Sequence, residues 1–140
     1  MRNLNPSFDL DNLRFGRFFI IRSKKFDDVH KSLKYGVWTS SFYNNKKFNN
    51  AFYKNNGEVY FLFTCLSCDF FVGLAKMTSL IDQNLEFAYW GEIGKWRGLG
   101  FVDWIFLRDV GFNYTVELEE KETQLHQLKD GQPVSWPNVK

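Results

Sequence analysis

The chain has 140 residues, of which 44% are hydrophobic and 19% aromatic, so it suits a single domain with a sizeable core. Its apolar runs are too short to cross a membrane, and its N-terminus lacks a signal-peptide segment. Its two cysteines make no disulfide framework. Together these features favour a reduced, intracellular protein. The net charge of +2 hides a basic N-terminal half, because residues 1–54 hold 11 Lys and Arg against 4 Asp and Glu. This asymmetry indicates either a phosphate-bearing partner or a charge distribution that only aids solubility.

The first regular elements expected along the chain are a strand and a helix. The run RFFII at residues 17–21 is rich in aromatic and β-branched side chains and is typical of a buried strand. A helix is expected next, capped by Asp27 or Asp28 and ended by Gly36. Residues 37–41 then predict a short extended piece.

A second helix is expected in the Asn-rich stretch that follows. Phe48, Ala51 and Phe52 recur at the spacing of one helical face, and the Asn-Asn-Gly at residues 55–57 ends the pattern.

Three strong strand patterns come after this helix. Residues 58–65 predict a central strand, residues 66–69 a turn and residues 70–77 an antiparallel partner. Residues 101–110 predict a further strand. Three of its side chains are expected on one face: Val102, Trp104 and Phe106.

The organisation of these elements predicts the fold class. Residues 1–13 are expected as a polar lead-in, and DGQP at residues 130–133 is expected as a turn. Strands interleaved with two or three short helices indicate a mixed α/β (α+β) fold with an open or partly closed sheet.

Signatures of common enzyme classes are missing from the sequence. There is no G-x-S-x-G motif and no P-loop, and His30 and His126 are the only histidines. Cys65 and Cys68 have a C-x-x-C spacing that suits half of a zinc site, but a closed site needs two further ligands. Two ordinary cysteines are the preferred interpretation, and no metal or cofactor is expected.

Tryptophan placement is the most informative feature. Trp38, Trp90 and Trp96 all fall on element ends or loops. A single tryptophan in such a place usually covers a hydrophobic edge. Three of them beside a basic half-chain indicate a cage for a methyl-bearing group or a platform for stacked bases, and adenine with an added methyl group would use both.

Five stretches of the chain together resemble a known family: FFIIRSKKFDDVHKSLKYGVWTSS, VYFLFTC, FFVGLAKMTS, YWGEIGKW and FVDWIFLRDV. That family is the YTH domain, which reads N6-methyladenosine in RNA. The resemblance covers roughly residues 14–134. It implies a single YTH-like domain over residues 14–140, with a curved central β-sheet flanked by short helices.

The resemblance implies an aromatic cage for the methylated base. Trp38 matches one wall, Trp90 matches the second, and Trp96 falls on the third, which some family branches supply as leucine. The spacing of six residues between Trp90 and Trp96 is one longer than is typical of members with two tryptophans there.

The resemblance also implies contacts to the edges of the base. The main-chain carbonyl of Thr39 falls where the family accepts the remaining N6–H, the backbone N–H of Lys24 falls where it reaches a ring nitrogen, and Asp28 addresses the Watson–Crick edge. Ser23 and Ser40 are expected to join these contacts. Because ionised Asp28 and adenine N1 are both acceptors, their contact needs a bridging water or a protonated carboxyl group.

Basic positions of the family imply phosphate contacts. Arg22 and Lys129 match such positions, and Asp130 is expected with them because it completes the matching R/K-D motif. Leu66 stands where one branch has a polar residue, so a base contact from that position is lost. The expected partner is single-stranded RNA, since the base must leave its stack, bound by a monomeric domain of a larger RNA-processing protein.

Three functions stay open from the sequence. The leading one is a non-enzymatic reader of N6-methyladenosine, for which one added methyl group allows about 10–200-fold discrimination. The alternative is a general single-stranded RNA-binding domain without methyl selectivity. The third is an enzyme acting on modified nucleotides, for which Asp28 is a candidate base but no nucleophile or metal set is present.

Overall fold

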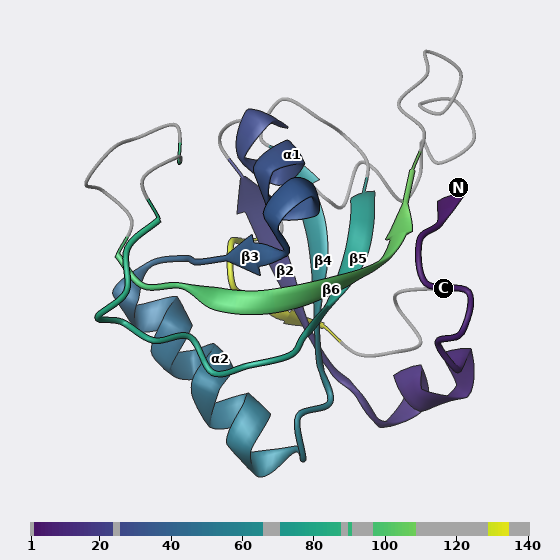
Figure 1. The fold of residues 1–140 in the computed structure, drawn as a ribbon. Helices are drawn as coiled ribbons and strands as arrows, with labels where there is room; N and C mark the ends of the chain where they lie inside the picture. Colours follow the sequence, from purple (N-terminus) through teal and green to yellow (C-terminus); the bar gives the residue numbers. More distant parts are fainter. Residues whose placement is uncertain are drawn as a thin grey trace.

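The computed structural model describes residues 2–23, 26–65, 71–87, 90, 97–108 and 129–134. In this part of the chain the helices are η1 (Leu10–Phe15, a 3-10 helix), α1 (Phe26–Tyr35) and α2 (Phe42–Lys54). The strands are β1 (Arg2–Asn3), β2 (Arg17–Ser23), β3 (Val37–Trp38), β4 (Val59–Cys65), β5 (Phe71–Met77), β6 (Gly100–Leu107) and β7 (Pro133–Val134) (Figure 1).

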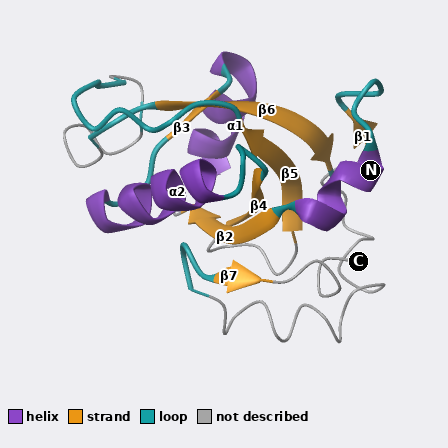
Figure 2. Cartoon of the chain, turned by 90° about the horizontal axis from the view of Figure 1, so that it is seen from below, coloured by secondary structure: helices purple, strands orange, loops and turns teal. Residues whose placement is uncertain are grey.

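The strands form one curved sheet. Its order is β1-β6-β5-β4-β2-β7, and β3 pairs with β6 off this path. The β2–β4 pair is parallel, and the other pairs described are antiparallel. Figure 2 shows α1 and α2 on the concave side of the sheet and η1 on the other side. The mixed α/β fold and the inner position of residues 59–65 are therefore confirmed.

The core lies on both faces of this sheet. In β2, Phe19 and Ile21 belong to the buried cluster that includes residues of α1 and α2, whereas Phe18 and Ile20 belong to the cluster that includes Leu13 of η1. Successive strand residues point to opposite faces, so a strand covered on both sides is apolar throughout. This is why RFFII has no polar alternation.

The second predicted helix is present as α2. The hydroxyl of Ser41 caps it by accepting the N–H of Asn44 at 3.1 Å. Phe48 and Ala51 are buried on its inner face, and Phe52 packs against the same cluster, as the spacing predicted.

The first predicted helix is present as α1, but its capping prediction is wrong. The helix already includes Phe26, so Asp27 and Asp28 lie in its first turn rather than at its cap. Negative side chains in this position are favourable because the helix dipole is positive at its N-terminus. Gly36 follows the last residue with φ of 66°, a conformation that glycine adopts readily, and its role in ending the helix is confirmed.

Strand β6 departs from simple alternation. Val102 and Trp104 belong to the cluster on the concave side, but Phe106 packs against the opposite cluster. The prediction that all three share a face is therefore wrong. The register of the β5–β6 pair shifts here and leaves Ile105 as an extra residue, and such a bulge turns the following side chain to the other face.

The polar N-terminal stretch takes part in the sheet. Strand β1 pairs with β6, and Leu13 of η1 is buried. The stretch is thus tied to the fold, while the domain boundary expected at residue 14 stays a prediction. The turn expected at residues 130–133 is present, and the turn expected at residues 66–69 lies outside the described residues.

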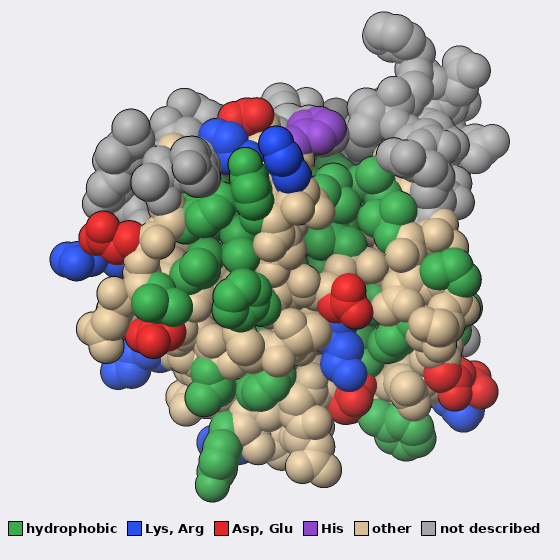
Figure 3. All heavy atoms as spheres, in the orientation of Figure 1, with side chains coloured by type: hydrophobic (Ala, Val, Ile, Leu, Met, Phe, Trp, Pro, Cys, Tyr) green, Lys and Arg blue, Asp and Glu red, His purple; other side chains and the backbone are tan. Residues whose placement is uncertain are grey.

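One face of the molecule carries exposed apolar side chains among polar ones (Figure 3). Figure 3 shows hydrophobic side chains gathered over α1, β3 and β6, with charged side chains scattered among them. Tyr35 of α1 and Phe101 of β6 are among the exposed large side chains. No helix in the described part of the chain has both the length and the apolar character needed to cross a membrane.

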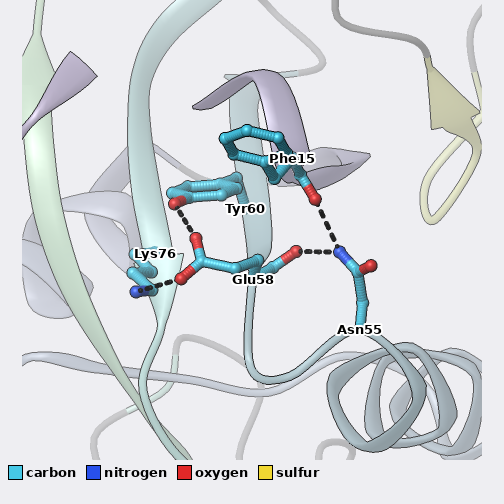
Figure 4. Close-up of polar contacts among 5 residues, drawn as sticks. All are labelled: Phe15, Asn55, Glu58, Tyr60 and Lys76. Carbon is cyan, nitrogen blue, oxygen red and sulfur yellow. Dashed lines mark hydrogen bonds and ion pairs between the residues drawn. The ribbon is translucent and has the colours of Figure 1, made fainter. Parts of the chain in front are cut away.

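A polar cluster joins η1, α2, β4 and β5 at one end of the sheet (Figure 4). The hydroxyl of Tyr60 donates to one carboxylate oxygen of Glu58 at 2.5 Å, and Lys76 Nζ donates to the other at 3.2 Å. The side-chain amide of Asn55 donates to the carbonyls of Phe15 and Glu58, each at 2.9 Å. Burial is the main cause that raises the pKa of Tyr60 above its usual 10.0, and the neighbouring Glu58 raises it further.

Replacing Tyr60 by Phe is expected to lower the free energy of unfolding by about 1 kcal/mol at neutral pH, because Glu58 loses one donor. Since the pKa of Tyr60 is raised in the folded state, the wild-type protein should lose stability as the pH rises above the ordinary value of 10.0, and Tyr60→Phe should flatten that decline. Urea unfolding at several alkaline pH values measures both effects. Tyr53→Phe, at an exposed position, is the control and should change neither the free energy of unfolding nor its decline with pH. Equal pH slopes for wild type and Tyr60→Phe would contradict the prediction.

Candidate functional site

The structure brings two of the three predicted cage residues together. Trp38 ends the short strand β3, and its ring lies 5.3 Å from that of Trp90 between centroids, at an interplanar angle of 75°. Both side chains are almost fully buried, at 7% and 5% exposure. Trp96 lies outside the described residues, so the third wall stays a prediction.

Phenylalanine rings support the Trp38–Trp90 pair. Phe63 of β4 contacts Trp38 edge to face at 4.9 Å, and Phe87 contacts Trp90 at 4.8 Å. Phe63 in turn packs on Trp104 at 4.5 Å. The sequence assigned no role in the site to Phe63 or Phe87, and only the tertiary structure shows that they pack against the two tryptophans.

The indole N–H groups of the pair are unusual. Among the described residues, Trp38 Nε1 and Trp90 Nε1 are buried and have no hydrogen-bond partner. A buried donor without an acceptor is unfavourable by about 1–3 kcal/mol, so most such groups in proteins are paired. Two of them on adjacent rings indicate a site that an acceptor-bearing ligand would complete.

A buried asparagine fixes the segment that follows Trp38. The side-chain amide of Asn45 donates to Thr39 Oγ1 at 3.0 Å and to the Ser40 carbonyl at 3.2 Å, and its oxygen accepts the Ser40 N–H at 2.9 Å. The Thr39 hydroxyl donates to the carbonyl of Arg97 at 3.0 Å. The side chain of Thr39 is therefore used inside the protein, and the ligand contact expected from this residue concerns its main-chain carbonyl.

Asp130 connects its own turn with the end of β2 and with residues 40–44. We term these residues the Asp130 cluster (Asp130, Arg22, Ser40 and Asn44). Its carboxylate accepts the N–H of Arg22 at 2.8 Å, the hydroxyl of Ser40 at 3.1 Å and the amide of Asn44 at 3.3 Å. This geometry favours a positioning role for Asp130 over the expected phosphate contact, because a carboxylate carries the same sign of charge as phosphate.

The environment of Asp130 shifts its pKa. Burial is the largest effect and raises the pKa above 3.8, while the hydrogen bonds from the cluster and the charge of Lys47 act in the opposite direction. Folding thus favours the protonated form, so the stability that this group contributes falls as the pH rises through its folded pKa. Three donors around the carboxylate offset part of the cost of burying its charge.

The turn beside Asp130 requires glycine. Gly131 has φ of 80°, and a Cβ atom there would lie 2.5 Å from Asn44 Oδ1. Its carbonyl accepts a hydrogen bond from Lys47 Nζ at 2.9 Å. The close approach of this turn to α2 brings the neighbouring Lys129, which is exposed, to the same side of the molecule as the start of α2.

The other predicted site residues lie where β2 meets α1. Arg22 and Ser23 end β2, and Asp28 lies in the first turn of α1. Ser23 and Asp28 are buried, and Arg22 is half-buried. Lys24 lies outside the described residues.

Sequence reasoning missed Asn44 and Asn45. Both are buried polar residues near the start of α2, yet in the sequence they are part of an Asn-rich stretch that carries no distinctive signal. Asparagine is a weak helix former in a helix interior, and two of them ahead of the apolar face could have indicated side chains with tertiary hydrogen bonds.

No group of three or more potential metal-binding side chains occurs in the described part of the chain. Cys68, the second residue of the C-x-x-C motif, lies outside that part. The described site thus consists of aromatic rings, hydrogen-bonding groups and basic side chains.

The fold and the Trp38–Trp90 pair place the chain among small mixed α/β domains that carry an aromatic recognition site. Residues 16–138 match the family described as YTH, the YT521-B-like domain. The chain belongs to this family.

Known relatives agree with this assignment. Human YTH domain-containing family protein 2 is 42% identical over 113 residues, which cover 79% of this chain and 19% of that protein. Human YTH domain-containing family protein 3 is 40% identical over 116 residues, covering 81% and 20%. The chain thus spans about a fifth of the length of these curated relatives.

Solved structures share the fold. The YTH domain of the Zygosaccharomyces rouxii MRB1 protein, in complex with N6-methyladenosine RNA, superposes with a TM-score of 0.73 at 29% identity, covering 89% of this chain and 82% of that one. The Toxoplasma CPSF4 YTH domain in complex with N6-methyladenosine-modified RNA gives a TM-score of 0.59 at 31% identity, covering 69% and 65%.

Removing the Asp130 carboxylate is expected to destabilise the fold. Asp130→Ala leaves donors from Arg22, Ser40 and Asn44 without their acceptor, which should lower the free energy of unfolding by about 1–3 kcal/mol. Urea unfolding at neutral pH measures the change. Asp103→Ala is the matched control, because Asp103 is exposed and accepts a single bond in the described part of the chain, from Asn5 at 3.3 Å. Equal effects of the two substitutions would contradict the role of the Asp130 cluster.

Proposed function

We propose that this domain reads N6-methyladenosine in single-stranded RNA by placing the methylated base against Trp38 and Trp90. The observation that carries the proposal is the buried, perpendicular pair of indole rings, in a member of the YTH family whose solved relatives include domains bound to N6-methyladenosine RNA.

The angle between the rings assigns them different tasks. Two rings at 75° cannot both lie parallel to one base, so a sandwich between Trp38 and Trp90 is not the arrangement that their geometry favours. One ring lies flat against the base, and the face of the other receives the N6-methyl group. A third wall from Trp96 would cover the opposite face of the base.

Selectivity for the methyl group follows from an apolar, water-poor site. Methylation adds no charge and leaves one N6–H, for which the main-chain carbonyl of Thr39 is the proposed acceptor. Burying one methyl group is worth about 0.8 kcal/mol by area, and poor packing around unmodified adenine adds to this. The total discrimination expected from a single carbon is about 10–200-fold.

Further contacts would orient the base. We assign the backbone N–H of Lys24 to a ring nitrogen and Asp28 to the Watson–Crick edge through a water, with Ser23 and Ser40 beside them. The hydroxyl of Ser40 is engaged by Asp130, which supports a role in holding the segment next to Thr39 rather than a hydroxyl contact to the base.

Phosphate contacts would come from Arg22 and Lys129 at the edge of the site. Lys129 is exposed, and Arg22 is held next to the same turn by its bond to Asp130. Such contacts add affinity that is independent of methylation and falls with salt.

A wider role of the domain is part of the same proposal. We propose that it acts as a monomeric, non-catalytic binding unit of a larger RNA-processing protein inside the cell, without a cofactor. The curated relatives, which are about five times longer, support the idea of a module within a larger chain.

Loss of either described tryptophan is expected to abolish methyl selectivity. Trp38→Ala and Trp90→Ala should reduce the preference for methylated over unmethylated RNA from about tenfold or more to nearly none, because the surface that receives the base and methyl group is removed. Paired titrations of the two oligonucleotides, with circular dichroism as a check of folding, measure this preference.

Phenylalanine variants separate the site from the core. Trp38→Phe and Trp90→Phe should lower the methyl preference, whereas Tyr60→Phe, at a buried ring of the opposite core cluster, should lower stability and leave the preference unchanged. Retained preference in the folded Trp38 and Trp90 variants would refute the assignment. Equal affinity of the wild-type domain for both oligonucleotides would instead identify a general single-stranded RNA-binding domain.

Lys129→Ala is expected to weaken methylated and unmethylated RNA by the same factor. Losing one phosphate contact should also reduce the slope of log affinity against log salt by about 0.7. Lys54→Ala, at an exposed position in the last turn of α2, is the control and should leave the slope unchanged. A loss confined to the methylated oligonucleotide would be inconsistent with a phosphate contact.

A further inference from the structure

The first turn of α2 exposes two aromatic rings directly after the proposed site. Phe42 and Tyr43 are 66% and 74% exposed, although Thr39 and Ser40, three residues earlier in each case, are buried. Large aromatic side chains contribute most when they are covered, so a pair left open beside a recognition site indicates a surface that a ligand covers.

Each of these rings lies close to the ammonium group of the lysine four residues further along the helix. Lys46 Nζ lies 5.5 Å from the centroid of the Phe42 ring, and Lys47 Nζ lies 5.6 Å from that of Tyr43. Residues four apart share a helix face, so each aromatic–lysine pair forms one small surface. Helix α2 contains three lysines and no acidic residue, which complements the charge of RNA and disfavours a basic partner.

The two surfaces point to different sides of α2. The ammonium group of Lys47 donates to the carbonyl of Gly131, in the turn that also holds Lys129. Phe42 comes one residue before Tyr43, so its side chain is turned by about 100° around the helix axis, away from Tyr43. Tyr43, rather than Phe42, is therefore the ring on the side of the proposed phosphate contacts.

We propose that Tyr43 stacks on an unmodified base next to the methyladenosine in the same RNA strand, with Lys47 beside the connecting phosphate. This inference rests on the proposed function and extends it from one base to its neighbour. Aromatic rings combined with basic groups are the usual means of binding single strands, because every base has a face that can stack. The contact would add affinity without reading the methyl group.

The test compares RNA of different length. Tyr43→Ala should weaken binding of a short methylated oligonucleotide by about fivefold or more, and the unmethylated oligonucleotide by the same factor. It should leave binding of the isolated N6-methyladenosine nucleoside unchanged, because the nucleoside has no neighbouring base. Tyr43→Phe keeps the ring and should retain most of the affinity. Tyr53→Ala, at an 85% exposed tyrosine in the last turn of the same helix, is the matched control and should have no effect.

Oligonucleotides with an abasic nucleotide on either side of the methyladenosine locate the stacked base. Wild-type protein should lose affinity for one of them, and Tyr43→Ala should show no further loss with that oligonucleotide. The inference is overturned if Tyr43→Ala binds all oligonucleotides like wild type, or if its loss is independent of the neighbouring base. Failure of the proposed function gives a different result, since wild type would then bind methylated and unmethylated RNA equally whatever happens at Tyr43.

Discussion

The site depends on one half-buried carboxylate. Asp130 accepts hydrogen bonds from the end of β2, from the segment between β3 and α2 and from the first turn of α2, so residues more than a hundred positions apart meet at one point. The charge is costly to bury, as the raised pKa of Asp130 indicates, and its donors are what make the position tolerable. The same bonds place Ser40, and with it the neighbouring Thr39 carbonyl, relative to the basic residues of β2 and the 129–134 turn.

The position of Trp38 is set by the sheet. Trp38 pairs with Gly100 of β6, where a larger residue would meet Ile81, and its ring packs on Phe63 of β4. Trp104, which precedes the bulge in β6, lies on the same face as Val102 and packs against Phe63. The position of the Trp38 ring is therefore a property of the core, and this part of the site is preorganised to the extent that the core is rigid.

Much of this architecture could be predicted from periodicity. The apolar runs of β2, β4 and β5 and the helical spacing of Phe48 and Ala51 predicted elements that are present, and the placement of Trp38 and Trp90 outside regular patterns indicated a site. The perpendicular rings, the bulge at Ile105 and the bonds of Asn45 could not be predicted, because they arise from contacts between segments far apart in the sequence. A turn such as DGQP predicts its own shape but not that Asp130 points into the protein.

The proposed function divides recognition between two physically different surfaces. A neutral methyl group can be distinguished only where water is excluded, and the Trp38–Trp90 pair, nearly fully buried, meets that condition. Phosphate requires exposed positive charge, which would weaken selectivity if it lay in the same place, because charge attracts methylated and unmodified RNA alike. The hydrogen bonds of the Asp130 cluster connect the segment next to Trp38 with Arg22 and the 129–134 turn, and so would keep the two proposed surfaces adjacent but separate. The two indole N–H groups of this pair are buried donors without an acceptor among the described residues. A ligand that is both flat and rich in acceptors, as a purine base is, would suit such a site.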